Sequence, residues 1–279
     1  IFKYAKNLAY FCQFLSEQKE VIMDRILSNQ NSRVKAWAKL ATKKGRLENK
    51  TYLLDGWHLV EEAIKAKAKF HAVMATEAQM AAHLADVPHG VPAFEISEEV
   101  AKHIAGTNTP QGIFAEISLP DKTFDPSYVH DGAWLLLDKI QDPGNVGTLV
   151  RTADAAGFKG VVLGEGTADA YAPKVVRAMQ GSQFHLEVLN GDLNEWTDAL
   201  TANGLPVYGS QLDEAAQSYR QIEPTTQFAL IVGNEGQGMS ATLAAKTTAN
   251  LYIPIHGQAE SLNVAIAGGI LMFSLAAGN

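Results

Sequence analysis

Residues 251–279 read LYIPIHGQAESLNVAIAGGILMFSLAAGN, and this stretch decides the fold class. Residues 251–255 predict a strand, residues 256–260 a polar loop, and the residues from Ser261 onward a long apolar helix rich in small side chains. A strand that runs through such a loop into a buried helix is typical of α/β active sites. Ser261 suits the helix N-cap, because its hydroxyl can accept from free N–H groups of the first turn. Two interpretations stay open: a plain capped helix, or a loop that holds a cofactor with Ser261 and Asn263 beside it.

The composition describes an ordinary globular protein. The 279 residues exceed the usual length of one domain, so two domains are expected, and 47% hydrophobic residues suffice for a proper core. A lone cysteine, Cys12, excludes a disulfide framework and a cysteine-based zinc site, and it fits a reducing cytoplasm. The apolar helix at 264–277 is too short to span a bilayer, and we find no secretory signal. We therefore expect a cytoplasmic protein with no membrane partner and no metal.

Charge is distributed unevenly along the chain. The net charge of −7 argues against unspecific binding of nucleic acid. Residues 33–69, however, carry many more bases than acids, which favours a directed contact with a polyanion. The alternative is a solvated helix face. The bases are Arg33, Lys35, Lys39, Lys43, Lys44, Arg46, Lys50, Lys65, Lys67 and Lys69.

The first half of the chain predicts a small α/β domain. We expect residues 1–22 to be a non-native or disordered extension, with Met23 as the natural start, and residues 23–118 to form the domain. Helices are predicted at 32–44, 57–66, 77–84 and 98–104, the last capped by Ser97, and strands at 51–55, 70–75, 92–96 and 112–117. Residues 119–132, which contain two prolines among charged residues, indicate a linker.

Residues 133–279 predict a parallel sheet covered by helices on both faces, because apolar strands alternate with helices. The expected strands are 134–137, 160–163, 184–189, 206–208, 228–232 and 251–255. Ligands of such sheets bind beyond the carboxyl ends of the strands. The polar, glycine-rich strand exits at 138–147, 233–238 and 256–263 are therefore where we expect chemistry.

The first two exits each contain residues of functional type. In the first, Asn145 is placed to cap the following helix. Arg151, expected in the first two turns of that helix, is either a surface residue paired with Asp154 or a guanidinium held near a phosphate or hydroxyl. In the second, Gly233 opens a glycine-rich turn that contains Glu235. The spacing of its glycines is wrong for a dinucleotide-binding turn. Two interpretations of this segment stay open: a plain tight turn, or a loop that lies close to an adenosine-like ligand.

Together the three exits resemble the SpoU/TrmH branch of the SPOUT RNA methyltransferases. The matching stretches are DPGNVGTLVRTADAAGF (142–158), IVGNEGQGMS (231–240) and LYIPIHGQAESLNVAIA (251–267). Upstream, the lysine-rich residues 34–46, YLLDG at 52–56 and TPQGI at 109–113 resemble the substrate-binding domain of the ribosomal-RNA members, which is similar to a ribosomal protein.

The resemblance implies properties that the residues alone do not give. It implies a deep trefoil knot in the C-terminal domain, an obligate homodimer with the active site across the interface, and S-adenosylmethionine as cofactor. The implied reaction is methylation of a ribose 2′-hydroxyl in structured RNA, with 23S ribosomal RNA favoured. By resemblance the cofactor-binding residues are Gly233, Ile253 and Leu262. The implied catalytic and substrate positions are Asn145, Arg151, Glu235, Ser261 and Asn263.

Three alternatives remain. A transfer-RNA ribose methyltransferase would use the same chemistry, and a non-catalytic RNA-binding module would use the same fold. The intact set of site residues argues against the second. A nucleotide-dependent oxidoreductase would need the glycine fingerprint that residues 233–238 lack.

Overall fold

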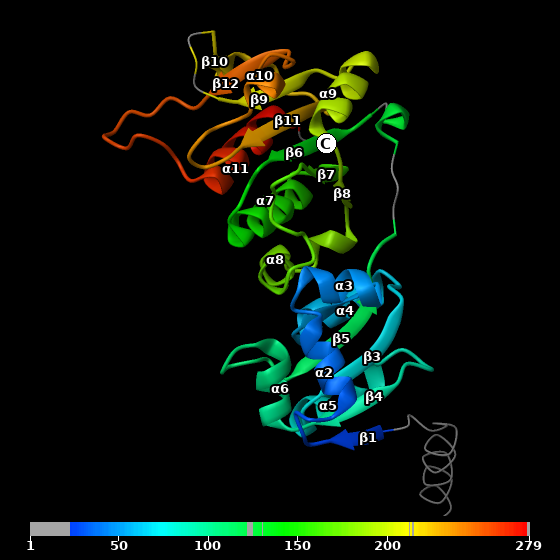
Figure 1. Cartoon of the computed structure of the whole chain (residues 1–279). Coiled ribbons are helices and arrows are strands. Elements are labelled where there is room, and N and C mark those ends of the chain that lie inside the picture. Colours follow the sequence, from blue (N-terminus) through cyan, green and yellow to red (C-terminus); the bar gives the residue numbers. More distant parts are fainter. Residues whose placement is uncertain (1–22, 122–124, 130, 212, 214, 278–279) are drawn as a thin grey trace, which may run out of the picture. The chain divides into compact units, whose positions relative to one another are not determined.

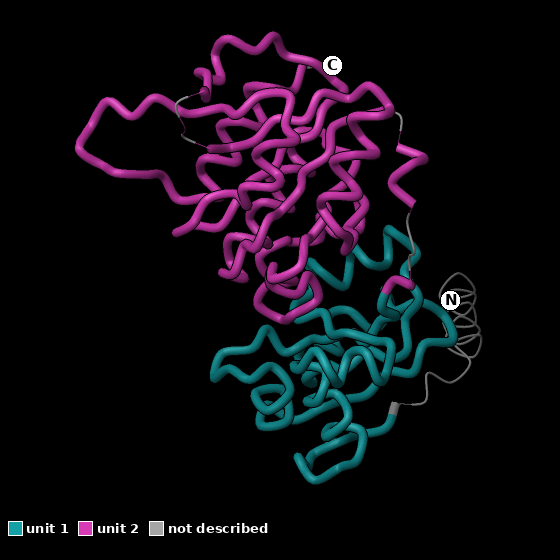
Figure 2. Tube along the Cα trace, turned by 45° about the horizontal axis from the view of Figure 1, so that its top comes forward, with its two compact units in different colours: residues 1–119 teal, residues 120–279 magenta. Residues whose placement is uncertain are grey.

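The computed structural model describes residues 23–121, 125–129, 131–211, 213 and 215–277. The chain divides into two compact units, residues 1–119 and 120–279 (Figure 2). The extension expected at residues 1–22, with Cys12, lies outside the described residues. Over the ranges just given, no helix is both long enough and apolar enough to cross a membrane.

The first unit is an α/β domain around a mixed five-stranded sheet of order β1-β4-β3-β5-β2 (Figure 1). Its strands are β1 (Met23–Ile26), β2 (Thr51–Asp55), β3 (Phe70–Ala75), β4 (Ala93–Ile96) and β5 (Ile113–Ser118). Its helices are α2 (Ser32–Lys39), α3 (Lys43–Asn49), α4 (Trp57–Lys65), α5 (Glu77–His83), a 3₁₀ turn (Leu84–Asp86) and α6 (Glu98–Ala105). Ser97 caps α6 as predicted, since its Oγ accepts from Val100 N at 3.2 Å.

The single basic helix predicted at residues 32–44 is wrong, because the chain turns between α2 and α3. Thr42 caps α3 by accepting from Gly45 N at 3.1 Å. The Arg46 side chain is buried and donates from Nη1 to the carbonyls of Leu40 and Ala41, at 2.8 and 3.0 Å. Arg46 therefore holds the turn together and is not part of the exposed basic surface.

The second unit is built on a seven-stranded sheet of order β10-β12-β9-β11-β6-β7-β8, and each of its strand pairs is parallel. The predicted parallel sheet is thus confirmed. Its strands are β6 (Ala133–Asp138), β7 (Gly160–Leu163), β8 (Glu187–Asn190), β9 (Val207–Ser210), β10 (Gln217–Ser218), β11 (Phe228–Gly233) and β12 (Ala249–Tyr252). Its α-helices are α7 (Pro143–Ala155), α8 (Pro173–Met179), α9 (Leu193–Ala202), α10 (Ala241–Ala244) and α11 (Val264–Leu275). Its 3₁₀ turns are Pro126–Tyr128, Ser182–Phe184 and Tyr219–Gln221.

Helices cover both faces of this sheet, as its apolar strands require (Figure 1). On one face Trp134 and Leu136 of β6 share a buried cluster with Trp196 of α9 and Leu243 of α10. On the other face α11 packs on α7. A Cβ added at Gly268 of α11 would lie 2.5 Å from Leu149 Cδ2 of α7. The small residues of α11 thus permit the close helix packing.

The strand order reverses between β6 and β11. From β6 the sheet continues outward through β7 and β8, and from β11 it continues through β9 and β12. The loops after β6 and β11 therefore leave neighbouring strands at the topological switch point, where α/β sheets bind ligands. Two of the three expected strand exits meet there.

Two strand predictions in this unit were imprecise, and one strand was not predicted. The strand expected at 184–189 begins only at Glu187, because Ser182–Phe184 forms a 3₁₀ turn. The strand expected at 251–255 ends at Tyr252, which leaves residues 253–255 outside the sheet. The two-residue strand β10 was missed, since so short a pairing has no sequence period.

Candidate active site

The first loop places Asn145 inside helix α7. Asp142 is the N-cap, because its Oδ1 accepts from Asn145 N at 2.9 Å and Pro143 opens the helix. This hydrogen bond holds the pKa of the Asp142 carboxyl below its usual range. The prediction that Asn145 caps α7 is therefore wrong, and the Asn145 side chain is left free for other partners.

The second loop is closed by Asn234, which the sequence analysis missed. Its side-chain Oδ1 accepts from the backbone N–H groups of Gly236 and Gln237 at 2.9 and 3.1 Å, and its Nδ2 donates to Lys139 O at 3.0 Å. Backbone hydrogen bonds of 3.0 and 2.9 Å join Asn234 and Gly238. An Asn before a glycine-rich turn is the available signal, because Asn side chains commonly close turns on their own backbone.

Gly233 must be a glycine for this loop to fold back on its strand. A Cβ there would lie 2.3 Å from Met239 N and 2.4 Å from Gly238 C, and backbone atoms cannot move away as a flexible side chain can. Gly233→Ala should therefore cost about 2 kcal/mol or more and lower the Tm by roughly 5 °C. Thermal unfolding followed by circular dichroism measures this. Gly257→Ala is the matched control, since a Cβ at Gly257 meets nothing within 4 Å, and an equal loss there would contradict the prediction.

The third loop ends at Asn263, which is the N-cap of α11. Asn263 Oδ1 accepts from the backbone N–H groups of Ala265 and Ile266 at 2.9 and 3.3 Å. The prediction that Ser261 caps this helix is wrong, because the helix begins at Val264, two residues too late for Ser261. The exposed Ser261 lines a pocket instead.

A line of side-chain hydrogen bonds connects the three loops. Asn145 Nδ2 donates to Glu235 Oε1 at 2.9 Å, and Asn145 Oδ1 accepts from Asn263 Nδ2 at 3.1 Å. Asn263 Oδ1 already accepts from the first turn of α11, so Asn263 donates to Asn145 through Nδ2. Asn145 in turn donates to Glu235, so the hydrogen bonds run in one direction from Asn263 to Glu235. We call Glu235, Asn145 and Asn263 the amide relay. The structure thus brings together three of the residues that the sequence singled out.

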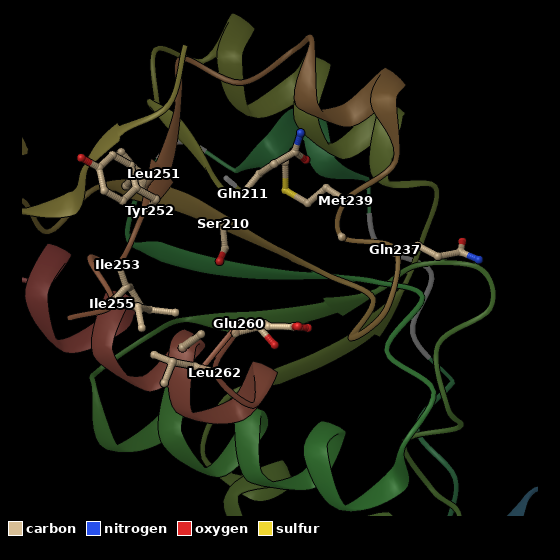
Figure 3. A pocket seen from close by; sticks show the side chains of 13 residues that line it. Ser210, Gln211, Gln237, Met239, Leu251, Tyr252, Ile253, Ile255, Glu260 and Leu262 are labelled. Carbon is tan, nitrogen blue, oxygen red and sulfur yellow. The ribbon is translucent and has the colours of Figure 1, made fainter. Parts of the chain in front are cut away.

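A pocket of about 370 Å³ lies beside the third loop (Figure 3). Its size falls at the lower end of the range of about 300–1,000 Å³ for small-ligand sites. Ile253, Ser261 and Leu262, all singled out from the sequence, line it. Gly233 does not line it, but Gly238 and Met239, which fold over Gly233, do. Lining residues that the sequence analysis did not assign are Ser210, Gln211, Gln237, Leu251, Tyr252, Ile255, Glu260 and Ala267.

Arg151 stands apart from both the relay and the pocket lining. It is the ninth residue of the 13-residue helix α7, so the expectation that it lies in the first two turns is wrong. Its side chain is exposed and, within the described chain, has no hydrogen bond or ion pair. The alternative pairing with Asp154 is also wrong, because Asp154 Oδ2 lies 2.8 Å from His185 Nδ1. The guanidinium is thus available to a ligand outside the chain.

One cluster in the first unit has metal-ligand chemistry. The ligand atoms of His58, Glu61 and Glu62 lie within 4.8 Å of one another. Lys65 Nζ, however, already lies 3.1 Å from Glu61 and 2.9 Å from Glu62. The lysine therefore supplies the cation, and we assign no metal to this cluster.

Comparison with known proteins identifies both halves of the chain. Residues 132–273 match the SpoU rRNA Methylase family, and residues 31–115 match the MRM3-like substrate binding domain. A 23S rRNA (guanosine(2553)-2′-O)-methyltransferase, RlmP, of Bacillus subtilis (strain 168) is 44% identical over 91% of this chain and 99% of its own length.

Solved structures agree over the same length. An AdoMet-bound rRNA methyltransferase from Sinorhizobium meliloti superposes with a TM-score of 0.81 at 30% identity, covering 91% of this chain and 97% of that one. The SpoU methyltransferase AviRb from Streptomyces viridochromogenes, in complex with AdoMet, gives a TM-score of 0.78 over 88% of this chain and 97% of its own, and at 24% identity it supports the fold alone.

Proposed function

The chain belongs to the SpoU rRNA methylase family, and we propose that it transfers a methyl group from S-adenosylmethionine to a ribose 2′-hydroxyl of 23S ribosomal RNA. The observation that carries the proposal is the amide relay at the switch point, with the pocket beside its third loop. The relative RlmP, whose name states this reaction on a guanosine, covers nearly the whole chain. A guanosine is accordingly the nucleoside we propose.

The pocket residues fit the proposed cofactor. Leu251 and Ile253 offer apolar surface for an adenine ring, and Leu262 offers apolar surface to the rest of the cofactor (Figure 3). Ser210 and Gln237 offer polar groups. Gly233 lets the backbone of the second loop close over the sheet beside the pocket. When bound, S-adenosylmethionine supplies a methyl group on a sulfonium sulfur, which is already a good donor. The protein has to place the ribose hydroxyl in line with it and remove its proton.

Arg151 is the residue we propose to act on that hydroxyl. A guanidinium stays protonated in water, so we propose that Arg151 orients the hydroxyl beside an RNA phosphate. To deprotonate the hydroxyl, Arg151 would first have to pass its own proton to that phosphate. Among the described residues its exposed side chain has no hydrogen-bond or ion-pair partner, which is compatible with that role. We propose that Asn145, Ser261 and Asn263 fix the loop and the ribose, and that Glu235 holds Asn145. The 2′-hydroxyl, absent from DNA, also explains the choice of RNA.

The test is mass-spectrometric mapping of ribose methylation in cells with and without the gene. Loss of one 2′-O-methyl group from 23S ribosomal RNA is the expected result. Loss from transfer RNA would select the alternative substrate. No change in either pool, together with no binding of S-adenosylmethionine to the purified protein, would select a non-catalytic RNA-binding module.

We further propose that residues 23–118 form the RNA substrate-binding domain, residues 119–132 the linker and residues 133–279 the methyltransferase domain. The matched substrate-binding family and the exposed bases of α2 and α3 support this division. The exposed bases on these helices are Arg33, Lys35, Lys39, Lys43 and Lys44.

The double change Lys39→Glu and Lys43→Glu should weaken binding of a 23S RNA fragment about tenfold. Each lost phosphate contact should also make the slope of the logarithm of the binding constant against the logarithm of the salt concentration shallower by roughly 0.7–0.9. Fluorescence anisotropy at several salt concentrations measures both quantities. Lys102→Glu is the control, because it reverses the charge of an exposed lysine on α6 of the same unit. An equal loss of RNA affinity in the double variant and in the Lys102→Glu control would refute a localised basic surface.

A homodimer with α11 in the interface is the assembly we propose. Ile266 and Phe273 are 56% and 59% exposed, and with the half-buried Ile270 they form a stripe at helical spacing. A helix that is apolar on all sides is normally buried on all sides. We also propose the family's trefoil knot for this unit and a cytoplasmic location, where ribosomal RNA and a reducing environment coincide.

The pair Ile266→Glu and Phe273→Glu should convert the dimer to a monomer, because it would bury two unpaired carboxylates in each copy of the interface. Light scattering after size-exclusion chromatography measures the mass. Leu47→Glu is the control, since Leu47 of the first unit is equally exposed at 58%. A wild-type protein that is already monomeric, or a double variant that stays dimeric, would contradict the α11 interface.

A further inference from the structure

Glu260 is the exceptional residue of the pocket. Of the 13 lining residues, which the structure describes in full, it alone carries a formal charge (Figure 3). The rest are apolar residues, amides, hydroxyls and a glycine. No lysine or arginine lines the pocket to neutralise the carboxylate.

The Glu260 carboxylate also lacks a partner elsewhere in the described chain. It is exposed, with no side-chain hydrogen bond or ion pair. By contrast Glu235, the other acid of the candidate site, is engaged by Asn145. An acid that stabilises the fold normally has such a partner, so Glu260 is available to a cationic ligand in the pocket.

Glu260 lies in the segment that leads to the amide relay, which places it near the reacting end of the cofactor. It directly precedes Ser261, and Asn263 of the amide relay follows two residues later. Leu251 of β12 and Ile253, which follows that strand, line the pocket with apolar surface, which suits the adenine instead. The carboxylate therefore belongs with the part of the ligand that faces the relay.

We propose that Glu260 pairs with the sulfonium of S-adenosylmethionine and thereby makes the pocket prefer the methyl donor to its product, S-adenosylhomocysteine. The inference rests on the proposed function. When the methyl group passes to the ribose oxygen, the bonding electrons stay on sulfur, which becomes a neutral thioether. The attraction to the carboxylate then disappears, and the product is released more easily than the donor.

The test is calorimetric titration of the full-length protein and of Glu260→Gln with three ligands: S-adenosylmethionine, S-adenosylhomocysteine and sinefungin. Sinefungin carries a protonated amine where the donor has its S-methyl group. The variant should bind the two cationic ligands about tenfold more weakly and the thioether less than about twofold more weakly, allowing for solvent screening of an exposed charge. Glu195→Gln, an exposed acid on α9 that does not line the pocket, should change none of the three affinities.

The outcomes separate this inference from the proposed function. Equal weakening of all three ligands would assign Glu260 to the α-ammonium group that they share, and would overturn the sulfonium pairing. Unchanged affinities would overturn any role in the pocket. A wild-type protein that binds none of the three would overturn the proposed function itself. Glu260→Asp, which keeps the charge, should retain the preference for cationic ligands, and unfolding curves of both variants confirm that they fold.

Discussion

Arg151→Lys is expected to slow ribose methylation about a hundredfold or more, which is the usual cost of losing a positioned group that transfers a proton or stabilises developing charge. Lysine keeps the positive charge and can still meet a phosphate, but it lacks the planar fork that holds two oxygens at once. The melting temperature should not change, because Arg151 is exposed and makes no hydrogen bond or ion pair within the described chain. Single-turnover methylation at saturating RNA and cofactor measures the effect on chemistry.

Arg220→Lys is the matched control for this substitution. Arg220 is an exposed arginine of the same unit that lies over the Tyr219 ring, outside the relay and the pocket lining. Its replacement should leave the methylation rate unchanged. Near-native methylation by Arg151→Lys would remove Arg151 from the proposed role.

The second large effect is expected at Asn263, where two substitutions separate stability from activity. Asn263→Asp keeps the oxygen that caps α11, and a negative charge is favourable at a helix N-terminus. It loses the Nδ2 donor and places a carboxylate oxygen against Asn145 Oδ1. If the Asn145 amide turns over to donate to the new carboxylate, its oxygen then faces Glu235. Either orientation leaves two acceptors in contact, so the relay cannot be satisfied.

We therefore expect Asn263→Asp to melt at the wild-type temperature and to methylate RNA about a hundredfold more slowly, the scale at which small displacements act. Asn263→Ala loses the cap as well, which costs about 1 kcal/mol and should lower the Tm by roughly 3 °C. Thermal melts and single-turnover rates of the two variants provide the comparison. A fully active aspartate variant would show that the Asn263–Asn145 hydrogen bond does not serve the reaction.

The sequence predicted the residues of the relay better than their local roles. Asn145 and Ser261 are both good capping residues, and both were assigned to helix caps that other residues occupy. Asp142 before Pro143 was the better signal for α7, since proline favours the first helical position. For α11, both Ser261 and Asn263 are acceptable caps, and nothing local says at which residue the helix starts.

Other features depended on contacts between distant residues. The pairing of β1 with β4 joins residues about seventy positions apart, which periodicity within a short segment does not register. The break between α2 and α3 depends on the burial of Arg46, whose type and spacing look like those of its exposed neighbours. The parallel sheet was predictable because its long apolar strands are buried on both faces.

Asn263 couples the stability of the N-terminal turn of α11 to the geometry of the amide relay. The same amide holds the first turn of α11 and the Asn145 side chain, so fraying of that turn would release the relay while the sheet stays intact. Local opening at helix ends requires much less free energy than global unfolding. Heat should consequently inactivate the enzyme before it melts, and cooling should restore activity without refolding of the sheet. Adaptation to higher temperature would then first select substitutions that stabilise the N-terminal turn of α11.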